Sequence, residues 1–298
     1  MTLTHIAPGV RRVTCANPSP MTHTGTQSYL VGRGRVALID PGPEDAAHRA
    51  ALLGSLDPGE RITTILVTHS HRDHSAGVPG LVAETRAPVM AFGPHGAGLS
   101  STMAALAEAG DLGGGEGADA GFVPDRTLKD GATIAVGEAR MTALHTPGHL
   151  SNHLCFALEG TGILFTGDTV MGWSSTLVSP PDGDMAAFMS SLTHLAERAE
   201  AGKDRRYLPG HGEPVEDPVR LLAEQKAHRE ARAEQVLAAL ADGPASAPEL
   251  TATVYADTDP RLHPAAMRNL LATLIWLTET GRAEALGPIA RDTRFRGR

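Results

Sequence analysis

A run of three histidines and one aspartate within six residues is the part of the sequence best suited to chemistry. These residues are His69, His71, Asp73 and His74, and they directly follow the apolar segment 62–68. Imidazole nitrogens and carboxylate oxygens suit zinc, which lies about 2.0–2.2 Å from each donor atom. A turn after a strand can direct His69 and His71 at one metal ion and the other two side chains at a second. The pattern therefore predicts a metal site with room for two ions.

Three more side chains can complete such a site. Two metal ions that share one ligand need about seven protein ligands. His149, Asp168 and His211 each follow a predicted strand and lie near a glycine, where the backbone can turn closely. The alternative is that these are unrelated surface residues in a chain with 14 histidines. Four polar motifs at successive strand ends argue against that alternative.

The elements that must position these motifs are strands and helices in alternation. Apolar and β-branched runs predict strands, and apolar residues at helical spacing predict helices. The predicted strands are 10–15, 28–31, 36–39, 62–68, 88–92, 133–136, 140–145, 153–158, 162–166 and 206–208. The predicted helices in this part of the chain are 44–56, 74–84 and 185–198. Such an order is typical of a layered α/β fold.

The chain changes character after Pro218. Predicted helices at 219–241, 247–254 and 263–280 precede a predicted hairpin within 282–295. This order is typical of a winged-helix module, so we divide the chain into domains 1–218 and 219–298. The third helix is mostly apolar with few basic residues, which favours a role in the active-site wall or a dimer contact over DNA binding.

Four motifs and one aspartate resemble those of the metallo-β-lactamase-fold hydrolases. The motifs are THSHRDH at 68–74, TPGH at 146–149, TGD at 166–168 and PGHG at 209–212, and Asp40 lies in LIDPG. The resemblance covers residues 1 to about 218 and implies an α/β fold of the αββα sandwich type. The remaining chain resembles the winged-helix-like domain of the β-lactamase-like protein 2 group. That group includes a mitochondrial single-strand-specific endoribonuclease.

The resemblance implies a role for each candidate site residue. It gives a first metal ion to His69, His71 and His149, a second to Asp73, His74 and His211, and a bridging position to Asp168. Asp40 is expected to orient a ligating histidine. For His145 and His153, hydrogen bonding near the site is favoured over direct ligation. Zinc is the expected metal, with iron and manganese as alternatives.

Hydrolysis is the expected reaction. A hydroxide that bridges two divalent ions would attack an ester, thioester or phosphodiester, with Asp73 as the proton carrier. His71 stands where iron–flavin redox relatives carry an acidic residue, which favours hydrolysis. Asp168 stands where some lactamases carry a cysteine, so true β-lactamase activity is expected to be weak or absent. The sequence contains no Gly-x-Ser-x-Gly motif for a serine nucleophile.

Composition and net charge restrict the class of substrate and the cellular location that we expect. The net charge is -8 and aromatic residues make up 4%, which favours a small ester or thioester over a long polyanion. Single-stranded RNA stays open as the alternative, with Arg291, Arg294, Arg296 and Arg298 as possible phosphate contacts. The sequence shows no membrane-spanning run and no signal peptide, so we expect a cytoplasmic protein without a membrane partner.

Two features near these motifs have two interpretations each. Residues 110–121 are rich in glycine and form either a surface loop or a flap beside the site. Trp173 follows Asp168 by five residues and belongs either to a pocket wall or to the core. The oligomeric state is left open by the sequence.

Overall fold

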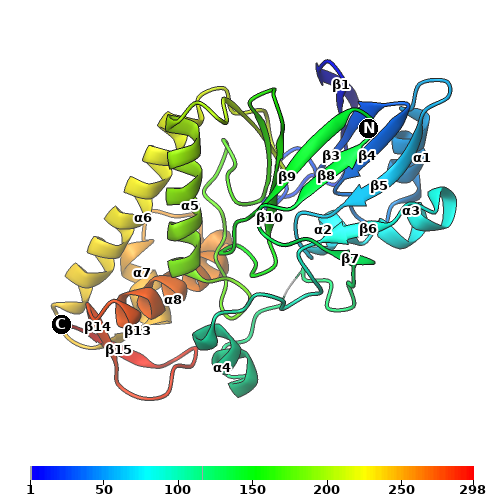
Figure 1. Cartoon of the computed structure of the whole chain (residues 1–298). Coiled ribbons are helices and arrows are strands. Elements are labelled where there is room, and N and C mark those ends of the chain that lie inside the picture. The colour runs from blue at the N-terminus through cyan, green and yellow to red at the C-terminus, as the bar shows by residue number, and fades with distance from the viewer. Residues whose placement is uncertain (1, 116) are drawn as a thin grey trace.

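The computed structural model describes residues 2–115 and 117–298. Its larger part contains two β-sheets packed face to face (Figure 1). The first sheet consists of β1 (Thr2–Ala7), β2 (Val10–Thr14), β3 (Gln27–Arg33), β4 (Arg35–Ile39), β5 (Arg61–Leu66), β6 (Val89–Ala91) and β7 (Arg126–Thr127), in that order. The second consists of β8 (Thr133–Val136), β9 (Ala139–His145), β10 (Leu154–Leu158), β11 (Ile163–Gly167) and β12 (Arg206–Pro209), in the order β12-β11-β10-β9-β8.

Strand β4 shows why the predicted strands are so apolar. Successive side chains point to opposite faces of a sheet. Val36 and Leu38 pack toward Leu52 of α1 (Ala46–Gly54), whereas Ala37 and Ile39 belong to the core between the two sheets. Both faces of the first sheet are therefore buried.

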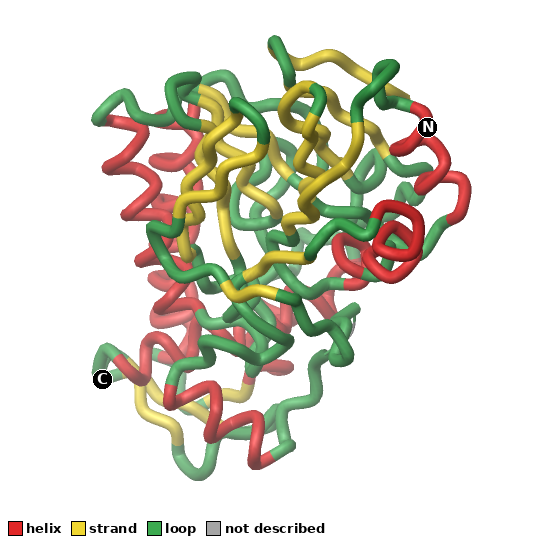
Figure 2. The backbone as a smooth tube through the Cα atoms, turned by 45° about the vertical axis from the view of Figure 1, so that its right-hand side comes forward, coloured by secondary structure: helices red, strands yellow, loops and turns green. Residues whose placement is uncertain are grey.

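Helices cover the outer face of each sheet. α1 and α3 (Val78–Thr85) lie on the first sheet, and α5 (Met185–Glu200) and α6 (Pro218–Leu240) lie on the second (Figures 1 and 2). Phe188 and Leu222 of the latter pair pack with Leu164 of β11. The predicted αββα sandwich is confirmed.

The helix predicted over 74–84 is instead two helices, α2 (Arg72–Ser75) and α3. The chain between them passes close to the turn after β4. A Cβ atom on Gly77 would lie 2.9 Å from the Pro41 carbonyl oxygen, closer than side-chain carbons normally approach. Helix α4 (Ser101–Ala109) was not predicted, because its apolar residues are mostly alanines that give a weak periodic signal.

The C-terminal part has the element order of a winged helix. It contains β13 (Ala245–Ser246), α7 (Ala247–Val254), a 3-10 turn (Pro260–Leu262), α8 (His263–Glu279), β14 (Ala283–Ala285) and β15 (Arg294–Gly297). The three strands pair in the order β13-β15-β14. Leu270 and Leu274 of α8 pack with Leu250 of α7 and Phe295 of β15. Among the helices of the described residues, none combines the length and apolar character needed to cross a bilayer.

Candidate metal centre

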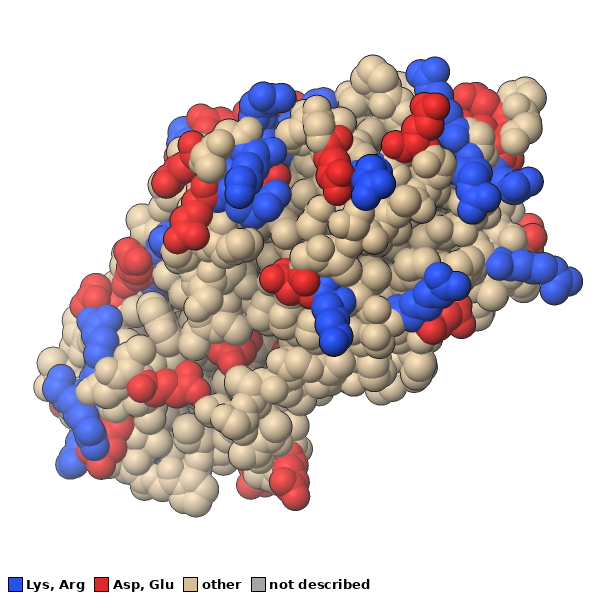
Figure 3. Space-filling view, viewed as in Figure 1, with Lys and Arg blue, Asp and Glu red and all other residues tan. Residues whose placement is uncertain are grey.

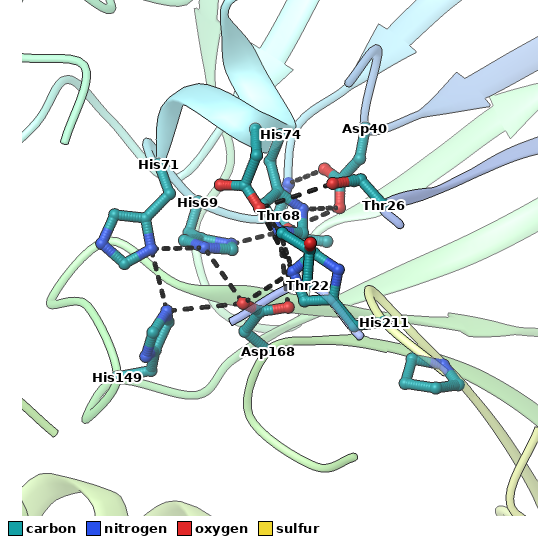
Figure 4. A network of polar contacts seen from close by, with 12 residues as sticks. Thr22, Thr26, Asp40, Thr68, His69, His71, His74, His149, Asp168 and His211 are labelled. Carbon is teal, nitrogen blue, oxygen red and sulfur yellow. Dashed lines mark hydrogen bonds and ion pairs between the residues drawn. The ribbon is translucent and has the colours of Figure 1, made fainter. Parts of the chain in front are cut away.

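The ends of several strands meet at one edge of the sandwich and bring the sequence motifs together (Figure 4). β4 pairs in parallel with β5, so Asp40 and His69 leave the first sheet side by side. β11 pairs in parallel with β12, so Asp168 and His211 leave the second sheet in the same way. His149 comes from the connection between β9 and β10.

The first group of converging side chains contains His69, His71, His149 and Asp168. His71 Nδ1 lies 3.1 Å from His69 Nε2 and 2.9 Å from His149 Nε2. Asp168 Oδ2 lies 4.0 Å from His69 Nε2 and 3.7 Å from His149 Nε2. Four ligands held about 2.0–2.1 Å from one tetrahedral ion are about 3.3 Å apart, so this spacing fits a single ion.

The second group contains Asp73, His74 and His211. His211 Nε2 lies 3.3 Å from His74 Nε2 and 3.2 Å from Asp73 Oδ2. The Asp73 oxygen lies 3.6 Å from His74 Nε2, which closes a triangle of three donor atoms. These distances also fit donors that surround one ion.

Asp168 faces both groups. Its Oδ2 lies 3.4 Å from His211 Nε2, and its Oδ1 lies 3.4 Å from His74 Nε2. Oδ1 is buried, yet it accepts no hydrogen bond from the described residues. A buried carboxylate oxygen without a hydrogen bond is costly, and a cation between the two groups would compensate it.

Hydrogen bonds on the far side of each ring assign the imidazole protons. His149 Nδ1 donates to the Leu177 carbonyl at 2.7 Å. Thr68 Oγ1 donates to Asp40 Oδ2, so the 3.0 Å contact between His69 Nδ1 and Thr68 Oγ1 requires the proton on His69. At the meeting point of His69, His71 and His149, at most one proton is then left for three ring nitrogens. Lone pairs that face each other in this way suit a metal ion.

The second group is oriented by the same kind of contact. His74 Nδ1 donates to Asp40 Oδ2 at 2.9 Å, and His211 Nδ1 donates to the Gly25 carbonyl at 3.3 Å. Asp40 Oδ1 accepts from the Thr68 backbone N–H at 2.7 Å. Asp40 therefore ties the start of the 68–74 motif, at Thr68, to its end, at His74. The donor set and these supporting hydrogen bonds fit a pair of divalent metal ions.

The two groups differ in charge. Burial lowers the pKa of His71 to about 3 and also lowers the pKa values of His69 and His149. Burial opposes charge on His211 as well, but Asp168 and Asp73 outweigh it and raise the pKa of His211 to about 9. The pKa of His74 rises for the same reason. Without a metal ion, burial thus disfavours charge on the three histidines of the first group, whereas nearby carboxylates favour charge on His74 and His211.

His145 and His153 lie outside both groups. His153 Nε2 accepts from the Asp168 backbone N–H at 3.1 Å, and its ring stacks on that of His69. His145 Nε2 contacts the Ser151 carbonyl at 2.9 Å, and its ring stacks on Phe92 with centroids 3.8 Å apart. His153 therefore touches ligand-bearing segments directly, and His145 supports the loop that carries His149.

A cavity of about 1050 Å³ lies over this centre. Side chains of both groups reach it, including His71, Asp73, His149, Asp168 and His211. The sandwich contributes apolar walls through Met21, Met171, Trp173 and Leu177. The C-terminal part contributes the opposite walls through Tyr255, Leu262, Ala265, Ala266 and Met267. The cavity is therefore shared by both parts of the chain.

The glycine-rich segment and Trp173, for which the sequence allowed two interpretations each, both line this cavity. Residues 111–115 and 117 of the glycine-rich segment form part of its wall. Trp173 lines it as well and stacks on His23, with ring centroids 4.8 Å apart. Sequence reasoning missed His23, Thr68 and the Leu177 carbonyl. Of these, only Thr68 carried a signal, because it lies within the first histidine motif.

Two protein families match separate stretches of the chain. Residues 21–211 match the family described as the metallo-beta-lactamase superfamily. Residues 246–290 match the family described as the beta-lactamase associated winged helix domain.

Individual proteins are similar over most of the chain. A beta-lactamase-like protein 2 homolog from Drosophila melanogaster is 31% identical over 94% of this chain and 91% of its own length. An atrochrysone carboxyl ACP thioesterase from Aspergillus chevalieri is 34% identical over 79% of this chain and 67% of its own. The lactamase-like protein adaB of Aspergillus niger is 36% identical over 78% of this chain, which spans only 63% of that relative. A solved metallo-beta-lactamase family protein from Thermus thermophilus has a TM-score of 0.76 and 28% identity, covering 98% of this chain and 99% of its own.

Proposed function

The chain belongs to the metallo-β-lactamase superfamily, and from this premise we propose that it hydrolyses an ester or thioester with an apolar acyl group, using two divalent metal ions. It is a metal-dependent hydrolase with an associated winged-helix domain. One observation carries the proposal: seven histidine and aspartate side chains that could hold metal ions converge at the base of a cavity whose other walls are largely apolar.

In this proposal, His69, His71 and His149 hold one ion, Asp73, His74 and His211 hold the other, and Asp168 contacts both. Zinc is the proposed metal because the ligands are histidine and carboxylate. When bound, the metal pair supplies a water-derived nucleophile at neutral pH and polarises the substrate carbonyl.

Asp73 is placed to move a proton. Its side chain reaches the cavity, whereas that of His74 is buried. Asp73 Oδ2 contacts His211 Nε2 at 3.2 Å and Thr26 Oγ1 at 3.4 Å, which leaves Oδ1 to take up a proton. Asp73 Oδ1 would receive the proton of the attacking water and return it to the leaving thiolate or alkoxide.

The cavity supports an apolar acyl group. Its volume of about 1050 Å³ is at the upper end for a small-molecule site. Met171, Trp173 and Met267 offer adaptable and aromatic contact surface to such a group. The thioesterase name of one relative is in line with a thioester, in which the acyl group is released from a thiol.

Single-stranded RNA is less favoured than a thioester. Arg296 and Arg298 form ion pairs with Glu284 at 2.7 and 3.5 Å, and Arg294 lies 3.9 Å from Glu249. These arginines therefore already have acidic partners. On the face drawn in Figure 3, basic and acidic residues are interspersed rather than gathered into a basic surface. A polyanion would gain little from such a surface.

The direct test is hydrolysis by zinc-loaded protein of N-acetylcysteamine thioesters with acetyl, octanoyl and naphthoyl groups, followed by the released thiol. We expect kcat/KM to rise from acetyl to the larger apolar groups, and to collapse in Asp73→Asn. Cleavage of an unstructured RNA that is lost in Asp73→Asn, without thioester hydrolysis, would overturn the proposed substrate class.

A further inference from the structure

The C-terminal helices hold the segment 168–182, which begins at Asp168 and ends beside α5. Gln225 and Arg229 lie one turn apart on α6, and Arg268 and Asn269 are neighbours on α8. All four side chains reach across to this one segment of the sandwich domain.

The contacts are to the backbone of the segment at four places. Gln225 Nε2 donates to the Met171 carbonyl at 2.9 Å, and Arg229 donates to the Thr176 carbonyl. Asn269 Oδ1 accepts from the Val178 N–H at 2.9 Å. Further along, Arg268 donates to the Pro180 carbonyl. The path of this segment therefore depends on side chains of α6 and α8.

The same segment contacts the side chain of one proposed metal ligand, His149. The Leu177 carbonyl accepts from His149 Nδ1 at 2.7 Å. Leu177 lies between Thr176 and Val178, whose backbone groups are held by Arg229 and Asn269. Thr176 Oγ1 also donates to the Asp168 carbonyl at 2.6 Å. The Val178 N–H and the Leu177 carbonyl belong to the same peptide group, so Asn269 holds the partner of His149 directly, and Arg229 holds the preceding carbonyl.

Arg229 and Asn269 act as a pair. Arg229 Nη1 donates to Asn269 Oδ1 at 3.3 Å, and its guanidinium carbon lies 5.2 Å from the centre of the Phe188 ring. Arg229 is only 6% exposed, so its charge would be costly without these partners. Its pKa is lowered to about 10 by burial. The interactions fix Arg229 in one orientation between α6, α8 and the segment.

We propose that Arg229 and Asn269 are positioning residues for His149, so that helices α6 and α8 set the affinity of the first metal site. This inference rests on the metal ligands of the proposed function. Through Asn269 of α8, it gives the winged-helix domain a role in the metal centre as well as in the cavity wall. Groups that orient a metal-ligating histidine typically change metal affinity about 10–100-fold when they are removed.

The test compares Arg229→Met with Arg232→Met in the full chain. Arg232 is on the same helix, donates to the Val254 carbonyl at 2.7 Å and lies over the Tyr255 ring at 4.2 Å. It is a matched control because its contacts go to the end of α7 and not to the segment 168–182. The readouts are the dissociation constants of the first and second Co²⁺ ions, from chelator competition, and the visible spectrum at one equivalent.

Arg229→Met is expected to raise the dissociation constant of the first Co²⁺ ion about tenfold. It should also change the visible spectrum recorded at one equivalent of Co²⁺. Arg232→Met should keep the dissociation constant of the first ion within twofold of wild type and leave the spectrum unchanged, even where it lowers the Tm of the metal-free protein. Equal effects of the two variants, or a folded Arg229→Met protein with unchanged first-ion affinity, would overturn the inference.

A second pair of variants, both at Asn269, tests the inference even if Arg229→Met does not fold. Asn269→Asp keeps the acceptor for the Val178 N–H, whereas Asn269→Leu removes it. Weakened first-ion binding in Asn269→Leu alone supports the inference, and equal affinity in both overturns it. His149→Ala separates the two proposals: unchanged Co²⁺ binding in that variant would instead show that the proposed ligand set is wrong.

Discussion

Asp40 Oδ2 accepts the Nδ1 proton of His74 at 2.9 Å, from a backbone held in the left-handed conformation with φ of 51°. This conformation is uncommon for residues other than glycine, although aspartate and asparagine adopt it more readily than most. Asp40 is 2% exposed and also accepts from the Thr68 backbone N–H and hydroxyl. The unusual backbone thus places one carboxylate between Thr68 and His74.

Asp40→Asn is expected to weaken metal binding about 10–100-fold while the protein stays folded. Asparagine tolerates the same backbone conformation, but its amide cannot accept all three hydrogen bonds, so a donor would face His74 or Thr68. Chelator competition with Zn²⁺ measures the affinity, and circular dichroism checks the fold. Unchanged affinity would mean that Asp40 does not orient His74.

Gly210→Ala is expected to lower metal affinity because the added methyl group would displace two of the proposed metal ligands. A Cβ atom at this position would lie 2.4 Å from Asp168 Oδ1 and 2.6 Å from His74 Cε1. Both ligands would have to move, so we expect at least a tenfold loss of affinity. Gly54→Ala is the control, because its Cβ would meet no atom within 4 Å. Wild-type zinc affinity in Gly210→Ala would contradict the packed arrangement of these ligands.

Leu262→Glu tests whether the C-terminal domain contacts the substrate. Leu262 lines the cavity yet is 39% exposed, so a charge there should cost little stability. KM for octanoyl and naphthoyl thioesters is expected to rise about tenfold with little change in kcat, because an apolar contact of roughly 1–3 kcal/mol is lost. Leu286→Glu, which is 48% exposed and away from the cavity, should behave as wild type. Equal KM values in the two variants would place the acyl group elsewhere.

His48 gives the folded protein a defined acid sensitivity. It is fully buried, contacts Ser28 Oγ through Nε2 at 2.8 Å, and burial lowers its pKa from 6.5 to about 4. Between these values the unfolded chain binds more protons, so the free energy of unfolding falls as the pH falls, by up to about 1.4 kcal/mol per pH unit. Urea unfolding of metal-free protein at pH 7, 5.5 and 4 should show a smaller loss for His48→Gln. Parallel curves for the two proteins would show that His48 does not titrate in this way.

Much of the fold and the metal centre could be predicted from the sequence because their signals are local. Each ligand motif follows a short apolar run, and ligands separated by more than 100 residues meet because the strands end at one edge of the sandwich. Asp168 and His211, for example, follow the neighbouring parallel strands β11 and β12. The apolar run at 62–68 reflects a strand that is buried on both faces.

Other features depend on contacts that leave little trace in a single sequence. The break between α2 and α3 follows from the approach of Gly77 to the Pro41 carbonyl, which lies in a different turn. The support of His149 comes from a backbone carbonyl, that of Leu177, and any residue type can supply such a group. Arg229 resembles an ordinary basic residue of an amphipathic helix until its contact with Thr176 is known.

The most direct test of the central claim is the rate of naphthoyl thioester hydrolysis as Zn²⁺ is added stepwise to metal-free wild-type protein and to Asp168→Ala. The account predicts that wild-type activity rises until two ions are bound per chain, and that Asp168→Ala binds zinc poorly and stays inactive. Full hydrolysis by metal-free protein, or wild-type zinc binding and turnover in Asp168→Ala, would contradict a dinuclear centre bridged by Asp168.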